Sequence, residues 1–256
     1  MNFFKLQATG NDFILHISKT SEVPNVDHVR QLCARKTGVG ADGWIQMWKD
    51  SKDWHWSYYN SDGSAGDFCG NGALCTALYL DQIAQEKELS WKIQEKTITA
   101  TKEKDGRYKI RIPAEGLRIE KLPETLVNEI SELNDRGLSL MEYVLAGVPH
   151  IVLSNHDNWE IQDRFAYNLD LAKHPSLPQG ANITWYSEAT KSAVTFERGV
   201  YEETLGCGSG ALAIYIASNG AADDFRFPGG NLKVEKIGED LSLEGLPKLV
   251  FEANIR

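Results

Sequence analysis

The chain has 256 residues, of which 42% are hydrophobic and 25% charged, and its formal net charge is −9. This composition is typical of a globular protein with an ample core, and its acidic balance argues against a nucleic-acid partner. No apolar run approaches the roughly 18 residues that a membrane span needs. The opening MNFFKLQATGNDFILH lacks a basic segment followed by an apolar one, so we expect no signal peptide.

The first part of the chain shows a regular succession of strand patterns around one helix. Apolar alternation and β-branched or aromatic runs predict strands at FFKLQ, FILHI, GWIQMW, WHWSYYN, LSWKIQ, TITATK and RYKIRI. A helix is expected after the fourth strand, beginning at Gly70. A second helix is expected over VDHVRQLCARK, where Val29, Leu32 and Cys33 share one face.

The second part of the chain repeats this order of elements. Strands are expected at LMEYVLAG, HIVLS, NITWYS, AVTFER, NLKVEK, LSLEG and LVFEA, with a helix following Cys207 and another over RFAYNLDLAKH. The segment IPAEGLRIEKLP contains Pro and Gly and continues no regular pattern. We therefore expect two domains, 1–115 and 116–248, with the strand at 249–256 packing on the first.

Two short motifs, CGNGAL from Cys69 and CGSGAL from Cys207, are nearly identical and lie about half a chain apart. Self-similarity on this scale predicts two duplicated halves. Each cysteine precedes a predicted helix, whose macrodipole and unsatisfied N–H groups can lower a thiol pKa and bind a carboxylate. The glycines that follow allow a ligand to approach the backbone closely. The motifs predict two reactive thiols, each beside an anion-binding site.

The other two cysteines fit a structural role. Cys33 and Cys75 both fall on predicted helical faces with leucines, so we expect them in the core. The chain has no C-x2-C pair, so neither a zinc site nor a thioredoxin-like redox pair is expected. Four cysteines in a chain of this length indicate no disulfide framework, and we expect a reducing cytoplasm.

The cysteine motifs occur together with ATGNDF, NSDGSAGDFCGNG, GVPHIVL, NITWYS and ERGVYEETLGCGSGA. In this combination, which runs from end to end, the chain resembles the diaminopimelate epimerase family of pyridoxal-phosphate-independent amino-acid racemases. The resemblance implies an α/β (α+β) fold of two similar domains, pseudo-two-fold related, each a curled mixed sheet around a central helix. It also implies an isomerase that uses no cofactor and no metal.

The resemblance assigns roles to particular residues. Cys69 and Cys207 correspond to the catalytic pair: one, as thiolate, takes the α-proton, and the other, as thiol, gives a proton to the opposite face. His150 and Glu197 correspond to residues that modulate the proton affinity of the cysteines. Substrate contacts are implied at Asn11, Asn60, Gly70, Asn71, Asn182, Glu197, Arg198, Gly208 and Ser209.

Departures from the family pattern concern the substrate. Val148 in GVPH stands where the family usually has an asparagine, and ERGVYEETLGC is one residue longer than the usual loop. We expect conversion of LL- to meso-diaminopimelate, a step toward lysine and cell-wall precursors. A racemase of another amino acid, such as histidine, and an isomerase of the phenazine-pathway type are the alternatives. We expect the binding partner to be a small-molecule amino-acid substrate, with no nucleic acid and no membrane, and a homodimer is left open.

A dinucleotide site is a weaker alternative. GCGSGA satisfies the G-x-G-x-x-G/A pattern, and two acids, Asp223 and Asp224, lie further along the chain. The pattern requires a buried strand that leads directly into the glycine turn, whereas GVYEET predicts a loop. A dinucleotide site would also leave the second motif, at Cys69, without a role.

Overall fold

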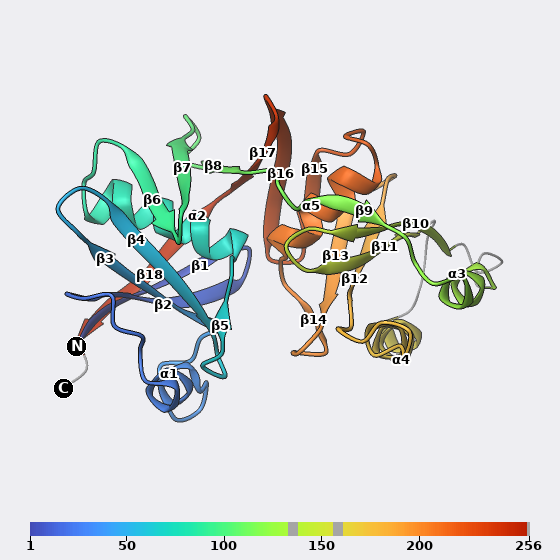
Figure 1. The fold of residues 1–256 in the computed structure, drawn as a ribbon, viewed down its shortest axis with the longest axis horizontal. Coiled ribbons are helices and arrows are strands. Elements are labelled where there is room, and N and C mark those ends of the chain that lie inside the picture. Colours follow the sequence, from blue (N-terminus) through green and yellow to red (C-terminus); the bar gives the residue numbers. More distant parts are fainter. Residues whose placement is uncertain (133–137, 156–160, 255–256) are drawn as a thin grey trace. The chain divides into compact units, whose positions relative to one another are not determined.

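The structure is a computed structural model that describes residues 1–132, 138–155 and 161–254 (Figure 1). The chain forms two compact units, and each is described by itself below. Unit 1 consists of Met1–Ile112 with Ser242–Arg256, and unit 2 of Pro113–Leu241. These limits differ slightly from the expected 115 and 248, because the chain returns to unit 1 within a strand, β17 (Asp240–Gly245).

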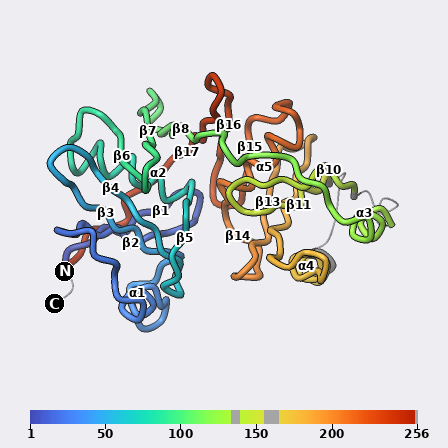
Figure 2. The backbone as a smooth tube through the Cα atoms, in the orientation of Figure 1, coloured from blue at the N-terminus to red at the C-terminus, as the bar shows by residue number. Residues whose placement is uncertain are grey.

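Unit 1 is a mixed sheet around one helix. Its first and last strands, β1 and β18, lie side by side and pair antiparallel, as the blue and red tubes of Figure 2 show. Besides β17, the elements of unit 1 are β1 (Asn2–Ala8), β2 (Asn11–Ile17), α1 (Val26–Cys33), β3 (Gly43–Lys49), β4 (Trp54–Asn60), β5 (Ala65–Gly66), α2 (Gly70–Leu78), the π-helical turn η1 (Tyr79–Ile83), β6 (Leu89–Ile93), β7 (Lys96–Lys102), β8 (Tyr108–Ile112) and β18 (Pro247–Asn254).

Unit 2 is built in the same way, with strands around the second central helix. Its described elements are β9 (Arg118–Glu120), α3 (Glu124–Ser131), β10 (Leu138–Leu145), β11 (Pro149–Asn155), α4 (Ile161–Ala172), β12 (Asn182–Ser187), β13 (Ser192–Glu197), β14 (Glu202–Thr204), α5 (Gly208–Ala217), β15 (Asp224–Phe227) and β16 (Gly230–Ile237).

The two units share one strand topology. In unit 1, β1–β2, β3–β4 and β6–β7 pair antiparallel, whereas β2–β3 and β4–β6 pair parallel. In unit 2, β10–β11, β12–β13 and β15–β16 pair antiparallel, whereas β11–β12 and β13–β15 pair parallel. The helices α1 and α4 occupy the equivalent crossovers β2–β3 and β11–β12. The duplicated halves predicted from the two CGxGAL motifs are confirmed.

The central helices α2 and α5 fill the interior of their units. Every residue of α2 is buried, and the helix packs on β1, β2, β8 and β18. The helix α5 packs on β9 to β13 and β16. A helix that is enclosed on all sides needs no amphipathic stripe, which explains why GNGALCTAL and GSGALAIYIA are apolar all round. The expected architecture, a curled mixed sheet around a central helix, is confirmed.

The short helix α1 follows directly from its sequence. Asn25 caps it, because its side-chain oxygen accepts a hydrogen bond from the N–H of His28 at 3.1 Å. The predicted apolar face of Val29, Leu32 and Cys33 is buried in unit 1, against Trp44 among others. Cys75 is also buried, so the structural role expected for both of these cysteines is confirmed.

The sequence misjudged two connecting segments. IPAEGLRIEKLP, expected to be irregular, contains the strand β9, which pairs with β10, and the helix α3 follows directly after it. GVYEET, expected to be a loop, contains the three-residue strand β14, which pairs antiparallel with β13. Both strands are short and partly exposed, so alternation of apolar and polar residues could not reveal them.

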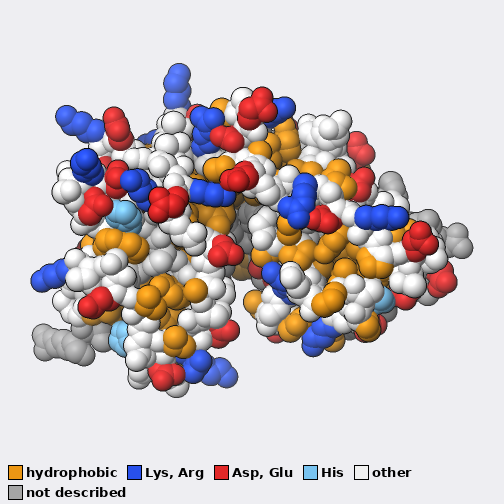
Figure 3. Space-filling model, in the orientation of Figure 1, with side chains coloured by type: hydrophobic (Ala, Val, Ile, Leu, Met, Phe, Trp, Pro, Cys, Tyr) orange, Lys and Arg blue, Asp and Glu red, His pale blue; other side chains and the backbone are white. Residues whose placement is uncertain are grey.

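The face of the molecule drawn in Figure 3 carries charges of both signs. On the face drawn in Figure 3, Lys and Arg side chains are interspersed with Asp and Glu. Of the helices that the structure describes, none is long and apolar enough to cross a membrane.

Candidate active site

Cys69 is the capping residue of α2. Its backbone is extended (φ −137°, ψ 115°), and its sulfur accepts a hydrogen bond from the N–H of Gly72 at 3.5 Å. This is the position that Ser, Thr, Asp or Asn usually occupies, with the side chain turned back to the first helical turn. The thiol is half-buried and lies beside Asn11, whose Oδ1 is 3.8 Å from the sulfur.

Cys207 repeats this geometry on α5. Its backbone is again extended (φ −130°, ψ 111°), and its sulfur accepts from the N–H of Gly210 at 3.3 Å. The hydroxyl of Ser209 lies 3.3 Å from the sulfur, and Cys207 is only 5% exposed. The two predicted reactive cysteines therefore occupy equivalent positions in two units of equal topology.

Burial governs the acidity of Cys207. It raises the pKa of the thiol well above the ordinary value, and the negative charge of Glu197 raises it further. Hydrogen bonds from Ser209, Gly210 and Thr195 lower this pKa without compensating for the loss of water. The N–H of Gly210 at the helix N-terminus thus lowers the pKa of this thiol, as expected of that position, but the effect of burial is larger and the net shift is upward.

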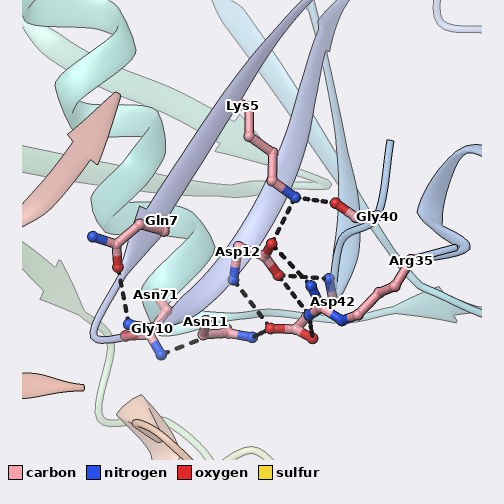
Figure 4. A network of polar contacts seen from close by, with 9 residues as sticks. All are labelled: Lys5, Gln7, Gly10, Asn11, Asp12, Arg35, Gly40, Asp42 and Asn71. Atoms are coloured by element: carbon pink, nitrogen blue, oxygen red, sulfur yellow. Dashed lines mark hydrogen bonds and ion pairs between the residues drawn. The ribbon is translucent and has the colours of Figure 1, made fainter. Parts of the chain in front are cut away.

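Hydrogen bonds to Asp42 and Asn71 hold the Asn11 side chain in one orientation (Figure 4). Its Nδ2 donates to Oδ2 of Asp42 at 2.9 Å, and its Oδ1 lies 3.5 Å from Nδ2 of Asn71. The buried Asn71 in turn lies with its Oδ1 3.2 Å from the hydroxyl of Thr9. Asn11, Cys69 and Asn71, which were predicted as site residues, thus lie together in unit 1.

Asp42 belongs to a charged network behind Asn11 (Figure 4). Asp12 and Asp42 each accept the backbone N–H of the other at 3.1 Å, and Arg35 bonds to both carboxylates. Lys5 pairs with Asp12 at 2.6 Å and also donates to the carbonyl of Gly40. Burial opposes ionisation of Asp12, but the hydrogen bonds from Arg35 and Lys5 outweigh it and hold its pKa at about 2.

In unit 2, His150 is completely buried and bonded at both ring nitrogens. Its Nδ1 lies 2.8 Å from the hydroxyl of Thr184, and its Nε2 lies 3.0 Å from that of Ser209. Nδ2 of Asn182 lies 3.4 Å from the same Nε2. Burial, together with the positive charge of Arg198, lowers the pKa of His150 to about 3, so the imidazole is neutral.

Glu197 is the last residue of β13, and Arg198 follows it beside this cluster. The backbone N–H of Arg198 donates to Oδ1 of Asn182 at 2.9 Å, and its guanidinium donates to the carbonyl of Gln179. Glu197 accepts a hydrogen bond of 2.6 Å from the hydroxyl of Thr204. Contacts within unit 2 therefore join five of the predicted residues, His150, Asn182, Arg198, Cys207 and Ser209. Glu197 precedes Arg198 in the chain, and its charge acts on Cys207.

Asn60 and Val148 stand apart from these contacts. Asn60 ends β4, is exposed, and donates from Nδ2 to Ser64 at 3.0 Å; in the described hydrogen bonds it reaches neither Asn11 nor Cys69. Val148 lies half-buried between β10 and β11, and its carbonyl accepts the N–H of Ala146. Gly70 and Gly208 are the buried first residues of α2 and α5.

The sequence analysis missed three polar residues at these sites: Asp42, Thr184 and Thr195. A signal for the two threonines was present, because residues two apart on a strand share a face. Thr184 follows the predicted Asn182 on β12, and Thr195 precedes the predicted Glu197 on β13. Asp42 sits in GADGW, in the segment between α1 and β3, and no periodicity marks it.

The described residues contain no group of three or more His, Cys, Asp or Glu side chains that could hold a metal ion. The polar groups at the two helix N-termini are instead amides, hydroxyls and thiols. All three kinds of group can hydrogen-bond a small polar molecule, and a thiol can also exchange a proton with it.

The fold is shared by several solved structures. A putative phenazine biosynthesis PhzC/PhzF protein from Clostridium difficile (strain 630) matches with a TM-score of 0.70 at 13% identity, over 100% of this chain and 99% of that one. A hydroxyproline epimerase from Agrobacterium vitis, with trans-4-hydroxy-L-proline bound, matches with a TM-score of 0.64 at 13% identity, over 99% and 91%. At such identities these likenesses show the amino-acid epimerase fold alone.

Sequence relatives specify the family. The diaminopimelate epimerase family profile matches residues 3–113. A diaminopimelate epimerase of Aquifex aeolicus (strain VF5) is 31% identical over 85% of this chain and 81% of its own length, and one of Gemmatimonas aurantiaca is 30% identical over 100% and 97%. The chain belongs to the diaminopimelate epimerase family and is an isomerase of that family.

Proposed function

We propose that this protein inverts the configuration at Cα of an amino acid, with Cys69 and Cys207 as an acid–base pair and no cofactor. The observation that carries the proposal is the equivalence of the two cysteines, each capping a central helix through its sulfur. Inversion requires one group to remove a proton from one face of the carbon and another to return one on the opposite face. Simple binding of an amino acid would require neither thiol.

The proposed reaction balances without an oxidant or reductant. A thiolate takes the α-proton, the electron pair of the broken C–H bond stays on the carbon, and the other thiol gives its proton to the opposite face. One S–H bond forms while another breaks, and the reverse reaction exchanges the roles. Burial raises the pKa of Cys207, so in this proposal its thiol form is well suited to the step in which a proton is donated.

The carbanion is stabilised, in this proposal, by the two helix N-termini. The N–H groups of Gly70, Asn71, Gly208 and Ser209 lie in the first turns of α2 and α5, where the macrodipole favours an anion. They bind the α-carboxylate and take up the charge that develops as the proton leaves. This role needs groups that are already oriented before the reaction, as N–H groups fixed in a buried helix are.

The remaining site residues select the substrate. Glu197 pairs with the substrate ammonium group, and the planar guanidinium of Arg198 pairs with a distal carboxylate. Asn11 and Asn60 add hydrogen bonds, and Asn182 holds both His150 and the backbone of Arg198. Together these residues suit an amino acid that carries a second charged group.

We propose LL- and meso-diaminopimelate as the substrate and product, a conversion that feeds lysine and cell-wall synthesis. Support comes from relatives named diaminopimelate epimerase that match over nearly the whole chain at about 30% identity. Val148 favours one alternative, a racemase of another amino acid such as histidine, because its side chain offers no hydrogen bond to a distal polar group. The likeness to phenazine biosynthesis proteins also leaves an isomerase of that type as an alternative.

Deuterium incorporation tests this function. The purified protein is incubated in D2O with a panel of amino acids that includes both diaminopimelate isomers and histidine, and label at Cα is followed by NMR. Exchange and inversion of diaminopimelate support the full proposal. Exchange of a different amino acid refutes the substrate but retains the two-cysteine chemistry, and no exchange with any amino acid refutes the epimerase function.

A further inference from the structure

Unit 2 contains a cavity of about 540 Å³ that the proposed reaction does not use. It lies at the end of α5 opposite to Cys207, because Ser218, which follows the last residue of that helix, lines it. A volume of this size accommodates a small organic molecule. The residues that line the cavity come from β10, β11, β12, the turn after β12 and the segment after α5; they are Met141, Ser154, Tyr186, Glu188, Ala189, Ser218, Ala221 and Ala222.

The strands of unit 2 fix part of this lining. Ser154 and Tyr186 are direct partners in the parallel pair β11–β12. On β10 the register shifts between Leu140 and Glu142, so Met141 is the extra residue of a β-bulge, and it lines the cavity. A bulge of this kind re-aims a side chain, and bulges are frequent beside functional sites. The positions of these three lining residues therefore follow from the sheet itself.

Tyr186 brings a hydroxyl without a partner to the cavity. The residue is only 5% exposed, and its ring packs edge-on against that of Phe225 at a centroid distance of 5.8 Å. Among the described residues, nothing forms a hydrogen bond with the hydroxyl of Tyr186. A buried tyrosine usually finds a partner for its hydroxyl, because leaving the group unmatched costs free energy. A molecule in the cavity can supply that partner.

The surroundings of this hydroxyl are negatively charged. Glu188 lines the cavity, and burial together with the charges of Glu188, Asp223 and Asp224 raises the pKa of Tyr186. The end of α5 adds the negative end of its macrodipole. In the described part of the chain no ion pair neutralises the three carboxylates, although Lys191 belongs to the same turn as Glu188. This end of unit 2 therefore favours a cation.

The apolar part of the lining distinguishes between kinds of cation. Met141 and three alanines form a wall without hydrogen-bonding side chains. A metal ion requires several oxygen ligands, and no group of three His, Cys, Asp or Glu side chains in the described ranges could hold one. An amino acid would bring its own carboxylate close to Glu188. A primary ammonium group on a short aliphatic chain suits both the carboxylate and the apolar wall.

We propose that this cavity binds an aliphatic ammonium ion, with the charged nitrogen between the hydroxyl of Tyr186 and the carboxylate of Glu188 and the alkyl chain against Met141. The ammonium group donates to the phenol oxygen and pairs with the carboxylate, so both polar groups gain a partner. None of the residues assigned to the epimerase reaction lines the cavity. The site is therefore independent of the proposed function.

NMR spectroscopy of the 15N-labelled protein tests the site with butylammonium chloride as the probe. Titration is expected to shift the backbone signals of Tyr186 and of residues 218–222 until they saturate, with a Kd of about 1 mM or below. Butan-1-ol has the same alkyl chain without the charge, and sodium butanoate has the opposite charge. At equal ionic strength both are expected to bind at least about tenfold more weakly, because neither forms a charged hydrogen bond with Glu188.

Two variants each remove one partner of the ammonium group. Tyr186→Phe deletes the hydroxyl and Glu188→Gln deletes the charge, and each is expected to raise the Kd for butylammonium by roughly three- to tenfold. Glu188 is exposed, so its substitution does not disturb the core. Glu239→Gln makes the same change of net charge at an exposed residue between β16 and β17, outside the cavity lining, and is expected to leave the Kd unchanged.

Four results would overturn the proposal. One is the absence of saturable shifts at the named positions, and another is a Kd in Tyr186→Phe equal to that of wild type. A third is binding of butan-1-ol as tight as that of butylammonium, which would leave the charge without a role. The fourth is equal weakening by Glu188→Gln and Glu239→Gln, which would reduce the effect to attraction by net charge. All of these readouts are independent of epimerase activity.

Discussion

Asp42 determines which end of the Asn11 side chain faces Cys69. A carboxylate can only accept, so the hydrogen bond of 2.9 Å to Asp42 places Nδ2 of Asn11 on the side of the carboxylate. The amide oxygen is then the atom that lies 3.8 Å from the sulfur of Cys69. The thiol meets an acceptor there, and an acceptor favours the protonated form of a thiol over the thiolate.

Substitution Asp42→Asn should release this orientation. An asparagine at position 42 can accept as well as donate, so the Asn11 amide can turn and present Nδ2 to the sulfur. We expect Cys69 to react about two- to threefold faster with bis(2-hydroxyethyl) disulfide at neutral pH, as a neutral hydrogen bond is gained by the thiolate. The exposed Asp27→Asn, which removes a surface ion pair with Arg30, serves as control. An unchanged or slower reaction in Asp42→Asn would contradict the role of Asp42.

His150 should make the stability of unit 2 depend on pH. Its folded pKa is about 3, because the imidazole is buried and lies near Arg198, whereas an unfolded histidine has a pKa of about 6.5. Between these values the unfolded state binds more protons, so the free energy of unfolding decreases as the pH falls. The stabilisation is complete above about pH 6.5, and about 3 kcal/mol of it is lost by about pH 4.

Urea denaturation of wild type and His150→Gln over this pH range checks the contribution. Glutamine keeps hydrogen-bonding groups at the position but does not titrate. The difference in free energy of unfolding between the two proteins should therefore change as the pH falls, with the wild type losing more. Two parallel pH profiles would show that His150 is not held neutral by the fold.

Serine substitutions should separate the catalytic role of the cysteines from their structural role. Serine is a good helix N-cap but a poor base, whereas alanine provides neither function. We expect Cys69→Ser and Cys207→Ser to keep wild-type thermal stability and to lose nearly all inversion of the substrate. The alanine variants should in addition lose about 0.5–2 kcal/mol of stability. A serine variant that inverts its substrate at near wild-type rate would refute the two-base proposal.

The sequence predicted the central relationship of this fold because duplication left two copies to compare. CGNGAL and CGSGAL gave the positions of α2 and α5, and the strand patterns around them gave the equal order of elements. The short, partly exposed strands β9 and β14 were not predicted, because a run of three residues is too short to show a periodic pattern of apolar side chains.

The parts of the site that the sequence did not predict depend on strand pairing and on burial of side chains in the folded chain. The contact of Thr184 with Thr195 arises from the register of β12 and β13, which single strands do not reveal. The raised pKa of Cys207 arises from burial, which the helix-terminus argument alone did not include. The reciprocal Asp12–Asp42 bonds join residues thirty positions apart in sequence, and only the folded chain brings them together.

Val148→Asn probes the substrate. An asparagine would restore a hydrogen-bonding side chain at the position where the family usually has one. If diaminopimelate is the substrate, kcat/KM for it should be unchanged or increased by up to roughly ten- to a hundredfold, the worth of a hydrogen bond to a charged group. Val148→Thr, which adds a hydroxyl at nearly constant volume, is the matched variant. A marked decrease for diaminopimelate would point to a substrate with an apolar distal part.

The glycines three residues after each cysteine offer a comparison between the two units. Gly72 and Gly210 are equivalent, and the N–H of each bonds to the sulfur of its cysteine. A Cβ at Gly72 would lie 3.2 Å from Cδ1 of Ile45, the flexible end of a side chain. A Cβ at Gly210 would lie 2.4 Å from Oγ1 of Thr195, which the β12–β13 pair holds in place.

We therefore expect Gly72→Ala and Gly210→Ala to behave differently. Alanine gains up to about 1 kcal/mol over glycine within a helix, which offsets the small displacement of Ile45 at position 72. At position 210 the overlap must push Thr195 away from its partners, and overpacking of this kind costs about 1–3 kcal/mol. Thermal denaturation should show Gly72→Ala close to wild type and Gly210→Ala clearly destabilised. Equal stability of the two variants would mean that Thr195 can move aside, and that the β12–β13 pair does not hold its hydroxyl in place.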